Sequence, residues 1–174
     1  PRTLEAQVED AYEVDPVHGS RYRFEPVGND GLLVETVIDP GGGLPKHHHP
    51  TQDEIWWVTE GEIRIFVGKE WRTLTAADGK VNVPAGVVHS IENRGKTEAR
   101  LTAEAHPARD LEAFLTESAA AAREGLFRRG GIPTSVRGAR WALAFFARYE
   151  DQVVMAFPPR PVQTAMRGLA RLVG

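Results

Sequence analysis

Apolar and polar positions alternate in short runs between residues 20 and 105, and turn-forming residues separate most of the runs. Ile63, Ile65 and Val67, for example, occupy every second position, as a half-buried strand requires. The pattern predicts strands over residues 21–27, 32–39, 54–60, 62–67, 70–75, 80–83, 88–93 and 97–105. Because no helical pattern interrupts these runs, the sequence predicts a mainly β domain, either a sandwich or a barrel.

The pattern changes to a helical period beyond Pro107. Apolar residues recur at steps of three and four over residues 111–126, and a second helix is expected over 135–149. A third amphipathic stretch follows at 162–173, with apolar positions Val162, Met166, Leu169 and Val173. The sequence therefore predicts an extension of about three α-helices after the β domain.

Charge changes at the same place as the period. Residues 1–106 carry a net charge of −7 and residues 107–174 a net charge of +4, which leaves −3 for the chain. We expect an N-terminal arm over 1–19 and a β-barrel over 20–106. The helical extension over 107–174 is then expected to pack on the barrel or on a partner subunit.

The extension contains ten arginines and no lysine. This composition favours a solvated helical face packed on the barrel, and one helix could also cover the barrel mouth. Attachment to an anionic membrane surface is a second interpretation, through Arg160, Arg167 and Arg171. No nucleic-acid partner is expected, because the chain as a whole is acidic and its arginines are dispersed.

Several classes of protein are disfavoured by what the sequence lacks. It contains no cysteine, which excludes disulfides, thiolate metal sites and cysteine nucleophiles. Its longest apolar stretch, residues 141–147, has seven residues, whereas a membrane span needs roughly 20. The first residues show no apolar core of the signal-peptide type. No membrane span is therefore expected, and the cytoplasm is the default location.

Histidines gather in two short segments of the predicted barrel. His47 and His49 are two positions apart, so on an extended backbone both rings leave the same face, about 7 Å apart at the backbone. The two rings can then converge on one ion, while His48 points away. The second segment contains His89, which follows a turn at residues 84–86.

A carboxylate accompanies these histidines. Glu54 opens the apolar run 55–58, and a carboxylate at the mouth of a buried strand needs a positive partner. Three neutral imidazoles and one carboxylate suit a first-row divalent ion, with coordination positions left for water or substrate. Other interpretations stay open: a core histidine with a hydrogen-bond partner, a solvated histidine loop, or a pairing of Glu54 with a surface arginine.

The order and spacing of these residues resemble the cupin superfamily. The first cupin motif is matched at every interval by Gly41, His47, His49, Glu54 and Gly61. The second is matched by Pro84, Gly86, His89 and Asn93, although its first glycine departs: Gly79 lies one residue too close to Pro84, and Asp78 occupies the expected position. The resemblance covers about residues 31–105, and the departure affects only a local turn.

The resemblance implies a double-stranded β-helix, or jelly-roll barrel, with a metal ion inside near one open end. The four cupin ligands correspond to His47, His49, Glu54 and His89. The ion would be one divalent transition metal, such as Fe, Mn, Ni, Cu or Zn. A homodimer is also implied, since many cupins are dimers.

Strand parity indicates which side chains share the face of the ligands. Trp56 and Val58 lie on the side of Glu54, and Ile91 lies on the side of His89. Such a lining suits an apolar or aromatic small-molecule ligand, although Trp56 could equally pack the barrel core. Arg64 and Gln52 are the polar candidates near this pocket.

Three functional hypotheses follow, because cupins carry many chemistries on one barrel. The favoured one is a metal-dependent enzyme, a dioxygenase-like oxidoreductase in which Glu54 is a ligand that can detach to act as a base. The second is a non-enzymatic small-molecule binding or sensor protein. The third is a sugar isomerase or epimerase, which would need Arg64 and Gln52 to hold the substrate's hydroxyl groups.

Overall fold

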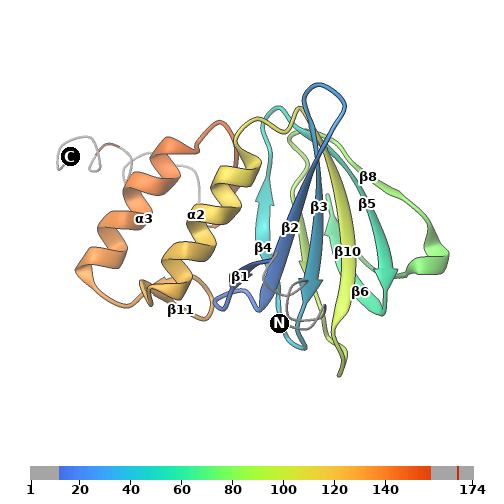
Figure 1. Cartoon of the computed structure of the whole chain (residues 1–174), viewed down its shortest axis with the longest axis horizontal. Helices are drawn as coiled ribbons and strands as arrows, with labels where there is room; N and C mark the ends of the chain where they lie inside the picture. Colours follow the sequence, from blue (N-terminus) through green and yellow to red (C-terminus); the bar gives the residue numbers. More distant parts are fainter. Residues whose placement is uncertain (1–11, 158–167, 169–174) are drawn as a thin grey trace, which may run out of the picture.

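The computed structural model describes residues 12–157 and residue 168. Two antiparallel sheets face each other, and two helices lie beside the open edge between the sheets (Figure 1). The larger sheet has the strand order β1-β2-β3-β10-β5-β8. Its strands are β1 (Glu13–Asp15), β2 (Ser20–Val27), β3 (Gly31–Ile38), β10 (Ala99–His106), β5 (Asp53–Glu60) and β8 (Val81–Val83).

The smaller sheet has the strand order β13-β4-β9-β6-β7. Its strands are β13 (Val154–Met155), β4 (Gly43–His48), β9 (His89–Glu92), β6 (Glu62–Val67) and β7 (Glu70–Thr75), and a 3-10 turn, η1 (Ala76–Asp78), follows β7. A separate hairpin joins β11 (Phe127–Arg128) to β12 (Ile132–Pro133). The predicted mainly β class is confirmed.

The core lies between the two sheets and follows the alternation of the sequence. In β10 every second residue is buried, so that Leu101, Ala103 and Ala105 face inward. From the opposite sheet, Ile63 and Ile65 are fully buried against them. Burial of these apolar side chains is the main favourable contribution to folding.

All eight predicted strands are present, as β2, β3 and β5 to β10. The prediction missed β1, β4 and the three two-residue strands. Strand β4 was not predicted because of its two central residues. Pro45 is conformationally restricted, Lys46 is charged, and both are exposed. No alternation of apolar residues marks such a strand.

The helical extension contains α2 (Leu111–Arg123) and α3 (Val136–Arg148), two helices within the described part of the chain rather than about three. The third expected stretch, 162–173, lies outside the described residues apart from Gly168, as do Arg160, Arg167 and Arg171. Helix α3 begins where expected, because the Ser135 side chain accepts a hydrogen bond from the Gly138 amide. Neither helix has the length and apolar content that a membrane crossing would require.

Aromatic side chains hold the two helices together. Phe145 of α3 is 3% exposed and stacks on Trp141, with 4.4 Å between ring centroids. The ring of Phe145 also lies 4.9 Å from that of Phe114 of α2, measured between ring centroids. Close approach of α3 to the preceding loop requires Gly138, since a Cβ there would lie 2.4 Å from the carbonyl oxygen of Leu126.

After α3 the chain returns to the smaller sheet. Strand β13 pairs with β4, with Val154 opposite His48 and Met155 opposite His47. At the C-terminal end of α2, Arg123 donates to the Val14 carbonyl and pairs with Glu13 on β1. The residues beyond 106 therefore contact both sheets.

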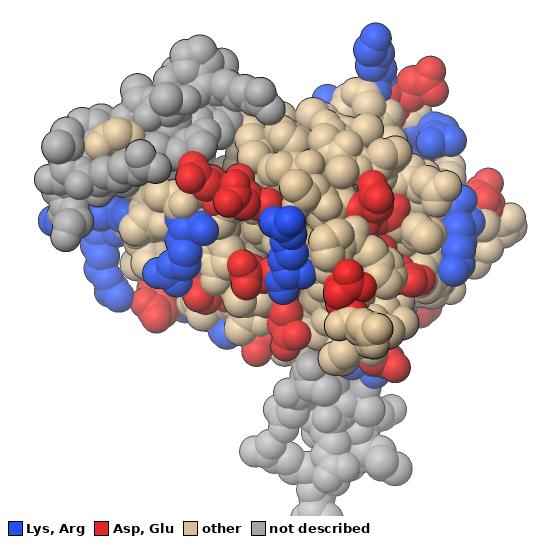
Figure 2. Space-filling view, turned by 90° about the horizontal axis from the view of Figure 1, so that it is seen from above, with Lys and Arg blue, Asp and Glu red and all other residues tan. Residues whose placement is uncertain are grey.

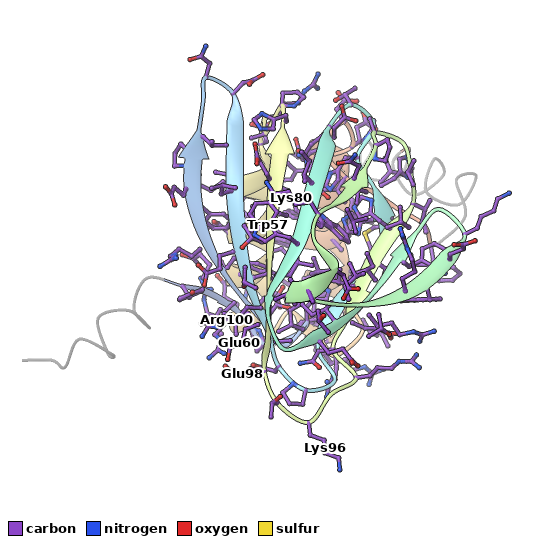
Figure 3. The ribbon with its side chains drawn as sticks, turned by 90° about the vertical axis from the view of Figure 1, so that its right-hand side faces the viewer. Trp57, Glu60, Lys80, Lys96, Glu98 and Arg100 are labelled. Atoms are coloured by element: carbon purple, nitrogen blue, oxygen red, sulfur yellow. The ribbon has the colours of Figure 1, made fainter. Side chains whose placement is uncertain are left out.

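The outer surfaces carry mixed charge. Figure 2 shows basic and acidic side chains interspersed on one face of the molecule. On the outer side of the larger sheet, away from the helices, Lys80 lies 4.4 Å from the ring centre of Trp57, and Arg100 pairs with Glu60 at 3.1 Å (Figure 3). Trp57 thus faces outward, on the opposite side of β5 from the buried residues Glu54 and Trp56.

Candidate metal centre

Three histidine rings meet at one end of the smaller sheet. His47 near the end of β4 pairs in register with His89 at the start of β9, and His49 follows directly after β4. One ring nitrogen from each histidine lies within 4.8 Å of the other two. His48 is not a member of this cluster. The structure therefore brings together the three imidazoles expected from the sequence.

Each ring is held by a hydrogen bond from its Nδ1 atom to a backbone carbonyl. His47 donates to Pro45 at 2.7 Å, His49 to Gln152 at 2.7 Å and His89 to Val87 at 2.8 Å. A neutral imidazole that donates through Nδ1 carries a lone pair on Nε2. All three Nε2 atoms are thereby fixed as acceptors or metal ligands, the arrangement that metal-binding histidines usually show.

These lone pairs require a positive partner. The Nε2 atoms of His47 and His89 are 3.1 Å apart, yet with both Nδ1 atoms donating, neither Nε2 has a proton to share. Two facing lone pairs at this distance repel each other unless a cation or an added proton lies between them. The donor set thus fits a divalent ion of the first transition row.

Glu54 completes the cluster from the larger sheet. Its side chain is buried, with Oε1 3.4 Å from Nε2 of His49 and Oε2 3.6 Å from Nε2 of His89. Gln52 donates to Oε1 and the Trp56 indole donates to Oε2, both at 3.0 Å. These donors orient the carboxylate toward the imidazoles, and among the described residues no arginine is a hydrogen-bond or ion-pair partner of Glu54.

Burial keeps the imidazoles neutral without a metal. Burial, and then the neighbouring His49, lower the pKa of His47 to about 4. Burial lowers the pKa of His49 to about 4 as well, and burial with the two neighbouring rings lowers the pKa of His89 further. Burial raises the pKa of Glu54 against an opposing effect of His47. The rings are ready to bind metal at neutral pH without losing a proton.

This electrostatic state predicts how metal binding responds to pH. Zinc binding at pH 6 should release at most one proton, from Glu54, because the imidazoles are already unprotonated. Three imidazoles of ordinary pKa would together release about two protons per ion at that pH. Calorimetric titration in buffers of different ionisation enthalpy counts these protons. Release of two or more would contradict the lowered histidine pKa values.

The candidate pocket residues from the sequence fall into two groups. Trp56 and Ile91 line a cavity of about 1110 Å³ together with His47, His49 and Glu54. The other three candidates do not line this cavity. Val58 packs in the core, and Gln52 donates a hydrogen bond to Glu54. Arg64 is the third, and it pairs with Glu92 at 2.7 Å while its guanidinium lies over Trp71.

Gln152 is a site residue that the sequence gave no reason to select. Its carbonyl accepts the hydrogen bond from His49, and its side-chain amide donates to Gln52 at 2.7 Å. Gln152 is 4% exposed and lies one hundred positions from Gln52 in the sequence. No local pattern marks a polar residue that becomes buried only through such a distant contact.

The cavity extends from the histidine cluster to the helices. Its apolar walls include Leu101 and Ala103 of the larger sheet. The helices contribute Phe114, Trp141 and Phe145, whose rings form the aromatic cluster between α2 and α3. A cavity of this size with mostly apolar walls is typical of a site for a small organic molecule.

Comparisons with known proteins agree with this geometry. Residues 34–103 match the family model described as a cupin domain. The chain is 31% identical over 71 residues to protein SchB of Streptomyces halstedii. The alignment covers 41% of this chain and 51% of SchB. It is 32% identical over 77 residues to the tetracenomycin polyketide synthase protein TcmJ of Streptomyces glaucescens. This alignment covers 44% of this chain and 51% of TcmJ. The chain spans about half the length of these curated relatives.

Two solved structures share the fold. KdgF from Halomonas sp. superposes with a TM-score of 0.54 at 20% identity, over 60% of this chain and 93% of that chain. An RmlC-like cupin from Shewanella frigidimarina superposes with a TM-score of 0.50 at 24% identity. The superposition covers 56% of this chain and 85% of that chain. At these identities the likeness concerns the fold alone, and it supports the expected jelly roll.

Proposed function

Since residues 34–103 of this chain form a cupin domain, we propose that it is a metal-dependent enzyme, a dioxygenase-like oxidoreductase acting on a small apolar organic molecule. One divalent transition-metal ion (Fe, Mn, Ni, Cu or Zn) would be held by His47, His49, His89 and Glu54. The observation that carries the proposal is the convergence of three fixed Nε2 atoms on a buried carboxylate, next to a large and mostly apolar cavity that His47, His49 and Glu54 help to line.

The cavity supports an apolar or aromatic substrate. Phe114, Trp141, Phe145 and Phe146 all line it, and aromatic walls favour flat carbon-rich molecules. The relative TcmJ is named as a polyketide synthase protein, which is consistent with a carbon-rich organic substrate.

Each residue of the site has a defined part in this proposal. The bound ion would supply Lewis-acid and redox chemistry next to the substrate. The Nδ1–H groups of the three histidines fix the rings against backbone carbonyls, which keeps the site preorganised. Glu54 can accept a proton from an acidic O–H or C–H group of the substrate, because burial raises its pKa and so makes its carboxylate a stronger base. A substrate that fills the space between the apolar walls would displace water from the reacting groups.

Oxygen uptake tests the proposal directly. We expect the purified protein to contain a transition metal and to consume O2 with at least one compound among catechols, flavonols and diketones. His47→Ala should abolish both the metal content and the uptake, whereas the matched change His48→Ala should leave both in place. A metal-loaded protein that consumes no O2 with any of these enolisable compounds would contradict the enzymatic proposal.

A non-enzymatic binding or sensor function is the second candidate. The predominance of apolar side chains in the cavity favours it, because such walls bind a ligand without acting on it. Recovery of a tightly bound ligand unchanged would support this alternative. A sugar isomerase or epimerase has less support, since Arg64 and Gln52 do not line the cavity. The homodimer and the cytoplasmic location stay predictions.

A further inference from the structure

The cavity has a second polar end, remote from the histidine cluster. The amide of Gly43, at the start of β4, donates to the carbonyl of His18 at 2.9 Å, whereas His47 lies near the end of the same strand. Four residues of extended backbone separate the two positions by roughly 13 Å. Both His18 and His47 line the cavity, which therefore runs along β4 from one polar end to the other.

A buried acid orients the ring of His18. Asp15, which is 2% exposed, accepts hydrogen bonds from the amides of Val17 and His18 and from Nδ1 of His18 at 2.7 Å. These bonds hold Asp15 as a carboxylate, and they lower its pKa although burial acts in the opposite direction. With Nδ1 bonded to Asp15, Nε2 is the ring nitrogen of His18 that is left to contact a ligand.

Tyr22 brings a hydrogen-bond donor to the same end. Its side chain is 1% exposed and lines the cavity. Within the described residues its hydroxyl makes no hydrogen bond of normal geometry, although Ser20 and Asp15 lie near it. Burial and the charge of Asp15 raise the pKa of Tyr22, so the hydroxyl stays protonated. A buried hydroxyl without a partner is unfavourable unless a ligand or water meets it.

We propose that Tyr22 and the Asp15–His18 pair form a second binding site, which recognises a hydroxyl group at the far end of an elongated apolar ligand whose other end lies at the metal centre. The inference rests on the proposed function, and it defines the substrate class further. A hydroxyl suits this pair of residues because it can accept from Tyr22 and can either donate to or accept from the ring nitrogen Nε2 of His18.

The walls between the two ends suit the body of such a ligand. Val34, Leu101 and Ala103 come from neighbouring strands of the larger sheet, and Ile91 faces them from β9. All four are buried apolar residues that line the cavity. The ligand class is thus an extended, mostly apolar molecule with a metal-binding group at one end and a neutral hydroxyl at the other.

Two probes that differ by one hydroxyl test the inference. Biphenyl-3,4-diol carries only the metal-binding catechol, and biphenyl-3,4,4′-triol adds a hydroxyl at the far end. With the zinc-loaded protein, which is redox-inert, calorimetry should show the triol binding about tenfold more tightly than the diol, as one additional satisfied hydrogen-bonding site would give. Tyr22→Phe should remove this preference and leave the affinity for the diol unchanged.

Tyr149→Phe is the matched control. Its hydroxyl donates to Glu117 at 2.8 Å, and Tyr149 is not among the residues that line the cavity. This variant should retain the tenfold preference. A second variant, His18→Ala, should reduce the preference without lowering the affinity for the diol.

The possible results are distinct. Equal affinity of the wild-type protein for the two probes, or binding of neither, overturns the inference whether or not the variants fold. A preference that survives Tyr22→Phe overturns it too. If the diol binds equally well to zinc-loaded and zinc-free protein, the proposed metal function fails, while a preference for the triol that depends on Tyr22 would still support the second site.

Discussion

Replacement of His89 by alanine is expected to lower the affinity for zinc by about a hundredfold or more, since substitutions of mere outer-shell partners already cost about 10- to 100-fold. His89 is 1% exposed, and its Nε2 faces both His47 and Glu54. The barrel should stay folded, because its core contains many other apolar contacts and the variant removes the repulsion between two lone pairs. Competitive titration with a chelating dye measures the affinity, and circular dichroism checks the fold.

His48→Ala is the matched control for this change. His48 is adjacent to two of the candidate ligands in the sequence but lies outside the cluster, opposite Val154 of β13. Its replacement should change the affinity for zinc by less than about threefold, within the spread of contributions from groups that do not contact the ion. Equal losses in the two variants would refute the assignment of ligands.

Phe145→Ala is expected to destabilise the protein by about 3–5 kcal/mol, the usual cost of deleting a buried aromatic side chain. Phe145 is 3% exposed and contacts Trp141, Phe114 and Tyr149, with ring centroids 4.4, 4.9 and 5.0 Å away. For a chain of this size the loss corresponds to a fall in Tm of roughly 10 °C. Thermal unfolding followed by circular dichroism measures it.

The neighbouring residue offers the comparison for this substitution. Phe146 is 38% exposed, so Phe146→Ala removes a ring that already contacts solvent and should cost less than about 1.5 kcal/mol. If the two variants unfolded at the same temperature, the aromatic cluster would not be what joins α2 to α3.

The strands and candidate ligands that could be predicted from the sequence are those with a short-range signal. In β10 the alternation of buried and half-buried residues follows the period of a strand without exception. His47 and His49 share a face because they lie two residues apart, and His89 reaches them because it is the β9 partner of His47, after a shift in register between Leu44 and His47. Here the local pattern and the tertiary contacts agree.

The features that the sequence did not reveal depend on contacts between distant parts of the chain. The two residues of β13 form a strand only because β4 offers an edge. Gln152 enters the site through a carbonyl, a group that every residue has and that no pattern distinguishes. Arg64 was expected near the pocket, but strand parity places it beside Glu92 on the other face of β6.

The hydrogen bond between His49 and Gln152 ties the C-terminal segment to the metal centre. By thermodynamic linkage, an ion that orders the ring of His49 also stabilises the docked position of residues 152–155, and release of that segment weakens the hold on the ion by the same factor. Resistance of the C-terminal segment to proteases would therefore report on metal occupancy, and loss of the segment would impair a cluster whose four proposed ligands all lie elsewhere in the chain.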